Sequence, residues 1–337
     1  MPLVASRVLV LPAALVLALG AGAASASPAD RTTGPADRTN GAASNSSAGP
    51  LTFALLGDTP YGEEQRAVFP ALVADIDADP KVRLVLHAGD VKGGSQTCDD
   101  ARFLDLAELY GTFHDPFVLT PGDNDWTDCH RPNNGSYLPT ERLDRIREIF
   151  YPQPHSTIGQ RPMHLDTQAD DPQHSAYVEN TMFERSRVVF AAVHVVGSRN
   201  GLAPWSGLPG GDQPEVREAE VAAREAAALA WIDEAFDRAE AGRAEGVLLL
   251  LQAEPVAGSE AFAAVRERIV ARSAAFDGQV LLVHGDEHRY EAEPAYAGVP
   301  NLTRLETFGD TATDWLRVTV DPRTDALFSW QPQVVGS

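Results

Sequence analysis

Four apolar runs of this sequence end in glycine followed by aspartate. The stretches FALLGD, LVLHAGD, FVLTPGD and VLLVHGD deliver Asp58, Asp90, Asp123 and Asp286. Carboxylates that meet at one point raise one another's pKa, so such a cluster requires a positive partner. Because the chain has only two lysines, Lys81 and Lys92, we expect that partner to be a divalent cation. Oxygen ligands favour Mg²⁺, Mn²⁺ or Ca²⁺.

Two side chains beside these motifs could take part in the same chemistry. His288 adds a ring nitrogen that Mn²⁺, iron or Zn²⁺ would accept. Lys92 could steady a phosphate as a point charge or partly replace a missing cation, and a solvated loop lysine is the alternative.

A single Gly-Asp has a simpler explanation, because aspartate after a strand is commonly a turn residue or a helix N-cap. Gly211-Asp212 is interpreted as such a turn, and Gly309-Asp310 is left undecided. Four motifs in a regular order favour a shared site.

The hydrophobic pattern predicts the elements that position these residues. Buried strands are predicted at 52–56, 82–87, 117–120, 188–196, 247–251 and 280–284. Helical patterns lie between them, around residues 69–76 and in the alanine-rich stretch 215–242. Strands that alternate with helices predict a largely parallel α/β sheet, whose ligands bind beyond the carboxyl ends of the strands. The four aspartates should therefore converge on one crevice.

Two segments depart from this alternation. The stretch from Asp314 has two short β-rich runs around residues 321–325, which predicts an antiparallel hairpin and so a mixed or second sheet. Residues 151–187 have little periodicity and are predicted to form a long loop that could cover the site.

The N-terminal 50 residues predict export. Arg7, an apolar stretch and small residues up to Ala26 are typical of a signal peptide at 1–26, with an uncleaved membrane anchor as the alternative. Residues 27–50 are too polar to offset their ordering entropy and predict a disordered linker. A domain is expected at 51–337, secreted or extracytoplasmic, with no transmembrane segment in the mature form.

The charge and the cysteine content of the chain bear on its partners and on a disulfide. The net charge of −21 and pI of about 4.7 repel polyanions, so no nucleic-acid partner is expected. In an oxidising compartment Cys98 and Cys129, the only cysteines, are expected to form a disulfide, with a zinc site as the alternative. The sequence leaves the oligomeric state open.

The order of the motifs resembles the calcineurin-like metallophosphoesterase superfamily. The stretches that carry the resemblance are GDTPYG, AGDVKGG, PGDNDW, LLQAEP and HGDEH, from about Phe53 to Tyr290. The resemblance implies an α/β fold, a four-layer α/β/β/α sandwich of two mixed sheets flanked by helices. It also implies a two-metal site that hydrolyses phosphoesters.

The ligand set departs from that family at several positions. The resemblance implies as metal ligands Asp58, Asp90, Asp123, Gln252, Asp286 and His288. Pro60 replaces a histidine ligand, which weakens one metal position. The exchange of nitrogen for oxygen ligands favours Mn²⁺, Mg²⁺ or Ca²⁺, with iron or Zn²⁺ also acceptable. Asn124 stands where the family has a histidine that assists the leaving group, and an amide cannot donate a proton on demand.

Two functions follow from these residues. The first is an exported phosphoesterase with one or two divalent ions, which hydrolyses phosphate mono- or diesters of a small substrate with a metal-activated hydroxide. Its catalytic residues would be Asp90, Asn124 and Lys92. The second is a non-catalytic protein of the same fold that acts as a binding or cell-envelope interaction module.

Overall fold

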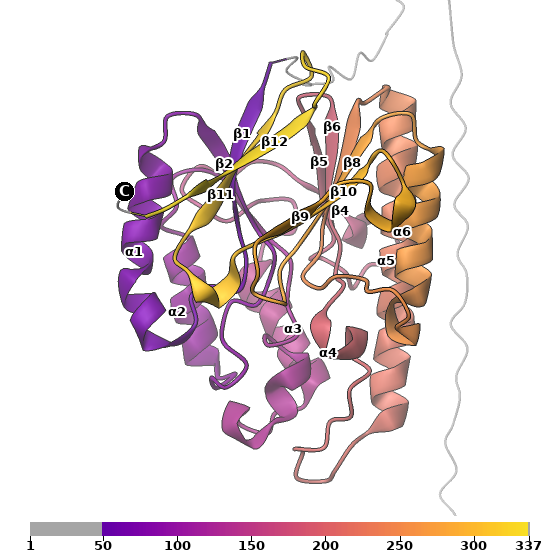
Figure 1. Ribbon diagram of the computed structural model, residues 1–337. Coiled ribbons are helices and arrows are strands. Elements are labelled where there is room, and N and C mark those ends of the chain that lie inside the picture. The colour runs from indigo at the N-terminus through magenta and orange to yellow at the C-terminus, as the bar shows by residue number, and fades with distance from the viewer. Residues whose placement is uncertain (1–48, 336–337) are drawn as a thin grey trace, which may run out of the picture. The chain divides into compact units, whose positions relative to one another are not determined.

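The computed structural model describes residues 49–335 (Figure 1). The predicted signal peptide lies outside the described residues, and so does the predicted linker up to residue 48. Among residues 49–335, no helix combines the length and the apolar character that crossing a bilayer requires.

The first sheet contains the N-terminal strands and the C-terminal hairpin. Its strands are β1 (Leu51–Leu56), β2 (Val82–His87), β3 (Phe117–Leu119), β11 (Trp315–Val320) and β12 (Phe328–Gln333). They lie in the order β12-β11-β1-β2-β3. The strands β1, β2 and β3 are parallel, whereas β11 is antiparallel to both β1 and β12. The predicted hairpin is therefore confirmed, and it extends this sheet.

The second sheet is also mixed. Its strands are β4 (Asp166–Thr167), β5 (Thr181–Arg185), β6 (Val188–Ala192), β7 (Gly246–Leu250), β8 (Gln279–His284), β9 (Glu291–Glu293) and β10 (Leu302–Glu306). They lie in the order β4-β5-β6-β7-β8-β10-β9, with β6, β7, β8 and β10 parallel. The strands at both edges pair in antiparallel fashion.

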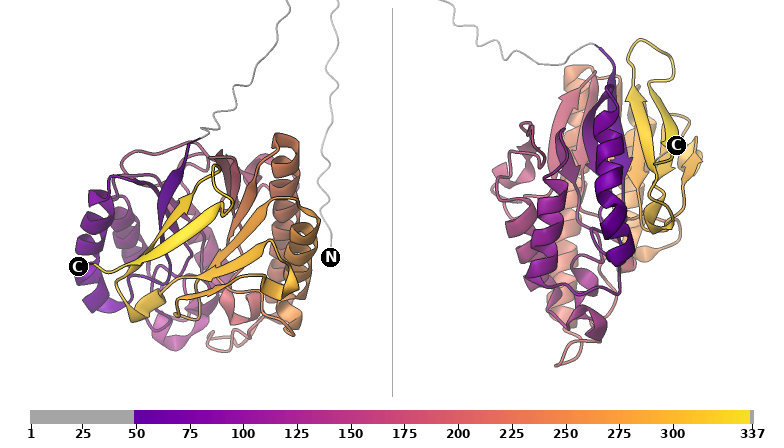
Figure 2. Two further views of the ribbon diagram at one scale, coloured as in Figure 1. Left: turned by 45° about the horizontal axis from the view of Figure 1, so that its top comes forward. Right: turned by 90° about the vertical axis from the view of Figure 1, so that its left-hand side faces the viewer.

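Helices cover the outer face of each sheet, so the described fold has four layers (Figures 1 and 2). The helices are α1 (Gly62–Ala78), α2 (Asp100–Tyr110), α3 (Pro139–Phe150), α4 (Gly197–Asn200), α5 (Pro214–Gly242) and α6 (Ala263–Ala275). The first sheet packs against α1 and α2, and the second sheet packs against α5 and α6. The predicted α/β/β/α sandwich of two mixed sheets is confirmed.

Alternate side chains of each central strand enter different hydrophobic layers. On β1, Phe53 and Leu55 pack between the two sheets, whereas Ala54 and Leu56 face the helices. On β8, Leu281 packs between the sheets and Leu282 faces α5 and α6. Because side chains alternate across a strand, a strand covered on both faces is usually apolar on both of them. This tendency explains the unbroken apolar runs of the sequence.

The prediction of one long loop at 151–187 is wrong. The segment contains β4 and β5, and β5 pairs along its whole length with β6. Residues near Ile158 bond to the free edge of β3, because the Ile158 and Phe117 backbones exchange hydrogen bonds of 2.9 and 3.1 Å. The segment thus continues both sheets. The predicted strand at 188–196 is also shorter, since β6 ends at Ala192.

Candidate metal centre

The four Gly-Asp motifs lie together at the carboxyl ends of four strands, which belong to the two sheets. Asp58 follows β1, Asp90 follows β2, Asp123 follows β3, and Asp286 follows β8 on the other sheet. Asp58, Asp90 and Asp286 have positive φ angles of 55, 56 and 79°. Such angles are uncommon outside glycine and cluster at functional sites, where the surrounding structure enforces them.

In two of the four motifs, the glycine before the aspartate makes room for another aspartate of the cluster. A Cβ on Gly122 would lie 1.9 Å from Asp90 Oδ1, and one on Gly285 would lie 2.1 Å from Asp58 Oδ2. The glycines are therefore needed for close approach, since real Cβ atoms are not found at these distances.

Three of the predicted ligands form a group that could hold a cation. One carboxylate oxygen from each of Asp90, Asp123 and Asp286 lies within 4.8 Å of the others. Gly197, at the start of α4, closes one side of this group, because a Cβ there would lie 2.5 Å from Asp286 Oδ1 and 2.8 Å from Asp123 Oδ2. These residues fit the oxygen donor set that a hard divalent cation takes.

Gln252 reaches the same group with its nitrogen. The Gly197 N–H donates to Gln252 Oε1 at 2.7 Å, which directs Nε2 towards Asp286 Oδ1 at 2.8 Å and Asp90 Oδ2 at 3.3 Å. In this arrangement Gln252 is a hydrogen-bond donor to the carboxylates. Its oxygen accepts the Gly197 N–H, and the role of Gln252 as a metal ligand stays a prediction.

Asp58 and His288 lie together beside the group. The Asp286 N–H donates to the carboxylate of Asp58 at 3.1 and 3.3 Å, and His288 Nε2 lies 3.4 Å from Asp58 Oδ1. On the other side of the ring, His288 Nδ1 lies 2.7 Å from Asp310 Oδ1. Asp310 belongs to the Gly-Asp motif whose role the sequence left undecided.

Tyr61 and Asn124 complete the arrangement around Asp90. The Tyr61 hydroxyl lies 3.0 Å from Asp90 Oδ2 and 3.4 Å from Asp58 Oδ1. Asn124 donates from its backbone N–H to Asp90 Oδ1 at 3.0 Å and from Nδ2 to Asp90 Oδ2 at 2.8 Å. Asn124 Nδ2 also donates to the Tyr61 hydroxyl at 3.0 Å. The sequence analysis did not predict a role for Tyr61, because no recognised motif includes this residue.

Lys92 is fully buried, with Asp125 and Asp90 among the charges that act on it. Its ammonium donates to the Gly93 carbonyl at 3.3 Å, and burial lowers its pKa to about 8, against the attraction of Asp125 and Asp90. Asp125 was also missed; it accepts the backbone N–H groups of Val91 and Gly122 at 2.9 and 2.8 Å. The interpretation of Lys92 as a solvated loop lysine is wrong.

Burial dominates the electrostatics of the centre. It raises the pKa of Asp90 well above the usual range, with a further contribution from the Asp123 charge, and it raises the pKa of Asp286 to about 8. It also raises the pKa of Asp125 to about 7. In contrast, the hydrogen bond to Asp58 raises the pKa of His288 to about 9. The carboxylates thus lack sufficient positive charge among their protein neighbours, which favours an added cation.

The predicted disulfide is present between Cys98 and Cys129, whose Cα atoms are 5.8 Å apart. It joins the loop that follows Lys92 to the short helix at Thr127–His130, just beyond Asp125. The bridge therefore connects the segments that carry two of the four aspartates.

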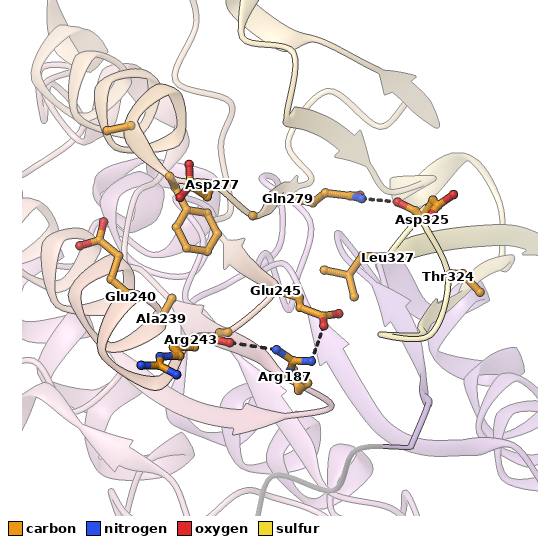
Figure 3. Close-up of a pocket in the computed structure, with 14 residues that line it drawn as sticks. Arg187, Ala239, Glu240, Arg243, Glu245, Asp277, Gln279, Thr324, Asp325 and Leu327 are labelled. Atoms are coloured by element: carbon orange, nitrogen blue, oxygen red, sulfur yellow. Dashed lines mark hydrogen bonds and ion pairs between the residues drawn. The ribbon is translucent and has the colours of Figure 1, made fainter.

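A cavity of about 730 Å³ lies at the other end of the second sheet (Figure 3). Its lining includes Arg187, Glu245 and Gln279, at the starts of β6, β7 and β8, with Arg187 paired to Glu245. None of the predicted site residues lines it. The aspartate cluster, at the opposite ends of these strands, is the better candidate site.

Comparisons with known proteins agree with the motifs. Residues 51–193 match the family model of the calcineurin-like phosphoesterases. The resemblance of this chain to that family is therefore confirmed, and the match supports a phosphoesterase-type function that uses a divalent metal. A comparison with curated proteins finds no match.

Similar solved structures include three proteins of low sequence identity. A dimetal phosphatase from Danio rerio is 12% identical, with a TM-score of 0.45, over 80% of this chain and 95% of that one. GAP50, the anchor in the inner membrane complex of Plasmodium, is 10% identical, with a TM-score of 0.45, over 86% of both chains. A 5'-nucleotidase from Candida albicans is 11% identical, with a TM-score of 0.44, over 85% of this chain and 52% of that one.

Proposed function

We propose that this protein is an exported, cation-dependent phosphoesterase that hydrolyses mono- or diesters of phosphate. The observation that carries the proposal is the group of oxygens from Asp90, Asp123 and Asp286, gathered within 4.8 Å at the carboxyl ends of strands. Ligands of α/β sheets bind at these ends. The family match over residues 51–193 supports the reaction class.

The bound cation would supply Lewis acidity towards a phosphoryl oxygen and activation of water. Asp90, Asp123 and Asp286 would hold it. Mn²⁺, Mg²⁺ and Ca²⁺ suit a donor set of carboxylate oxygens better than iron or Zn²⁺ does.

The roles of the surrounding residues follow from their contacts. Asn124 is partly exposed beside Asp90; both hydrogens of its Nδ2 donate to Asp90 Oδ2 and the Tyr61 hydroxyl, and an amide has no proton to give to a leaving group. Lys92 has no exposed surface and acts as a fixed positive charge that attracts Asp125 and Asp90. Lys92 is therefore a positioning residue in this proposal.

The proposal makes a statement about substrates. General-acid help is typically worth ~10² to 10⁴ in rate, and Asn124 cannot provide it. Esters with acidic leaving groups, such as aryl phosphates, need this help least. We expect aryl mono- or diesters to be hydrolysed faster than alkyl esters.

One observation favours the second function, a non-catalytic binding module. Neutral donors from Tyr61, Asn124 and Gln252 already bond to Asp90. A centre satisfied by these donors would keep the fold without turnover.

An assay of the secreted, purified protein separates the two functions. Metal content is measured first, and 4-nitrophenyl phosphate and bis(4-nitrophenyl) phosphate are then assayed with Mn²⁺, Mg²⁺, Ca²⁺ and Zn²⁺. We expect turnover with at least one ion and a large loss in Asp90→Asn. Asp237→Asn, on the outer helix α5, is the matched control, because it removes only an exposed ion pair with Arg272. Turnover absent with every ion, or equal in Asp90→Asn, would exclude the enzyme.

A further inference from the structure

The family resemblance implies two metal positions, and the residues of this chain fit only one of them. We propose that the centre holds a single divalent cation, on Asp90, Asp123 and Asp286, and that the Tyr61 hydroxyl fills the second position between Asp58 and Asp90. This inference rests on the cation dependence of the proposed function. It assigns Tyr61, rather than a second ion, to the space that Asp58 and Asp90 share.

The hydrogen bonds of Tyr61 identify its hydroxyl as the occupant. A phenol has one proton to donate, and the shorter contact directs it to Asp90 Oδ2 at 3.0 Å rather than to Asp58 Oδ1 at 3.4 Å. Its oxygen accepts from Asn124 Nδ2 at 3.0 Å. Both hydrogen-bonding capacities are thus used within the protein, and a cation that bridged Asp58 and Asp90 would have to displace the hydroxyl.

Packing holds the Tyr61 ring in this place. The ring contacts His288 edge to face, with 5.3 Å between the centroids. It also lies against Gly93, where an added Cβ would be 3.3 Å from Tyr61 Cδ2. The Tyr61 N–H donates to Gln65 Oε1 at 2.6 Å, which fixes the backbone. Gly93, at this contact, is a position where a larger residue would crowd the ring.

The remaining sides of Asp58 are also occupied. The Asp286 N–H donates to both of its oxygens, and His288 lies 3.4 Å from Oδ1. His288 faces Asp310 with its other ring nitrogen at 2.7 Å. Pro60 stands where the family has a histidine ligand, and proline offers no donor atom to a metal. Asp58 therefore has protein partners where the family would have a metal.

The test counts bound ions in the secreted, purified protein. Metal-free protein is titrated with Mn²⁺ by equilibrium dialysis, and the electron paramagnetic resonance spectrum distinguishes an isolated ion from an exchange-coupled pair. We expect one equivalent with an isolated-ion spectrum. Tyr61→Phe removes the hydroxyl from the position between Asp58 and Asp90 and should bind a second equivalent, whereas the control Tyr137→Phe, whose ring packs under Arg142, should bind one. Tyr61→Ala opens the space and should bind a second equivalent.

The outcomes separate this inference from the proposed function. Two equivalents in the wild type would show that the position is a metal site and would overturn the inference while leaving the enzyme intact. A stoichiometry of one in both Tyr61→Phe and Tyr61→Ala would overturn the role given to Tyr61. One bound equivalent without turnover would support the single-ion inference and contradict the proposed phosphoesterase function. Zero bound equivalents would contradict both.

Discussion

A Cβ on Gly122 would lie 1.9 Å from Asp90 Oδ1 and 2.4 Å from the Asp90 backbone nitrogen. The two residues follow β3 and β2, which are adjacent parallel strands of the first sheet. The backbone and the carboxylate of Asp90 therefore occupy the space that a side chain at position 122 would need. Asp90 can take this position only because residue 122 is a glycine.

We expect Gly122→Ala to displace Asp90 and so weaken cation binding. Overpacking of a close contact typically costs ~1 to 3 kcal/mol, and the clash here includes backbone, which cannot rotate away. The free energy of unfolding in urea and the Mn²⁺ affinity should both decrease. Gly210→Ala is the control, since nothing lies within 4 Å of a Cβ there. Equal unfolding midpoints and affinities for the two variants would contradict the packing argument.

The Cys98–Cys129 bridge should contribute strongly to stability. It closes a loop over a sequence separation of 31, for which the chain-entropy model predicts ~3 to 4 kcal/mol. We expect the double variant Cys98→Ala with Cys129→Ala to unfold at lower urea concentration than the oxidised wild type.

A reducing agent provides the control for this prediction. It should lower the unfolding midpoint of the wild type and leave that of the double variant unchanged. If the reduced and oxidised wild-type proteins unfold at the same urea concentration, the bridge does not stabilise the fold.

The convergence of the aspartates could be predicted because it depends on local pattern and one topological rule. Each apolar run marks a strand buried on both faces, and each Gly-Asp marks its carboxyl end. In a parallel α/β arrangement these ends meet. The prediction therefore holds for Asp58 and Asp286 even though β1 and β8 belong to different sheets.

The strand before Asp310 was missed because its sequence does not look buried. β10 reads LTRLE, and both Arg304 and Glu306 are buried in it. Arg304 is satisfied by carboxylates that include Glu291 at 2.8 Å and Glu254 at 3.2 Å. These partners lie 13 and 50 positions away along the chain, and hydrophobic periodicity does not reveal such ion pairs. With β10 recognised as parallel to β8, Gly309-Asp310 would have been placed near His288.

The position of Tyr61 was beyond sequence reasoning for a different reason. Its hydroxyl reaches Asp90 from a loop after β1, and the direction of a loop side chain depends on packing against residues such as His288. Lys92 shows the same limit, since a lysine in a Gly-rich loop gives no sign of burial.

A buried set of hydrogen-bonded side chains supports the turn that carries Asp123. Trp126 Nε1 donates to His194 Nε2 at 3.1 Å, and His194 Nδ1 lies 2.8 Å from Glu179 Oε1. Glu179 has no exposed surface and also accepts two hydrogen bonds from Arg147, at 2.7 and 3.0 Å. Burial raises the pKa of Glu179, but Arg147 and His194 outweigh burial and lower it to about 2.

This lowered pKa predicts a defined acid sensitivity. In the unfolded chain the carboxyl has its ordinary pKa of 4.5, so its stabilising effect is complete above about pH 4.5 and is lost as the pH falls towards 2. The difference between the two pKa values corresponds to about 3 kcal/mol. Glu179→Gln removes this titration and leaves Arg147 without its buried partner. We expect the variant to be less stable than the wild type at pH 7, with the difference shrinking between pH 4.5 and 2.

Urea unfolding of both proteins from pH 7 to pH 2 measures this difference. Glu184→Gln, on the neighbouring strand β5 and partly exposed, is the control and should follow the wild type. A difference between Glu179→Gln and the wild type that stays constant with pH would mean that Glu179 does not titrate with the lowered pKa. The support of the Asp123 turn would then depend on packing and not on this ion pair.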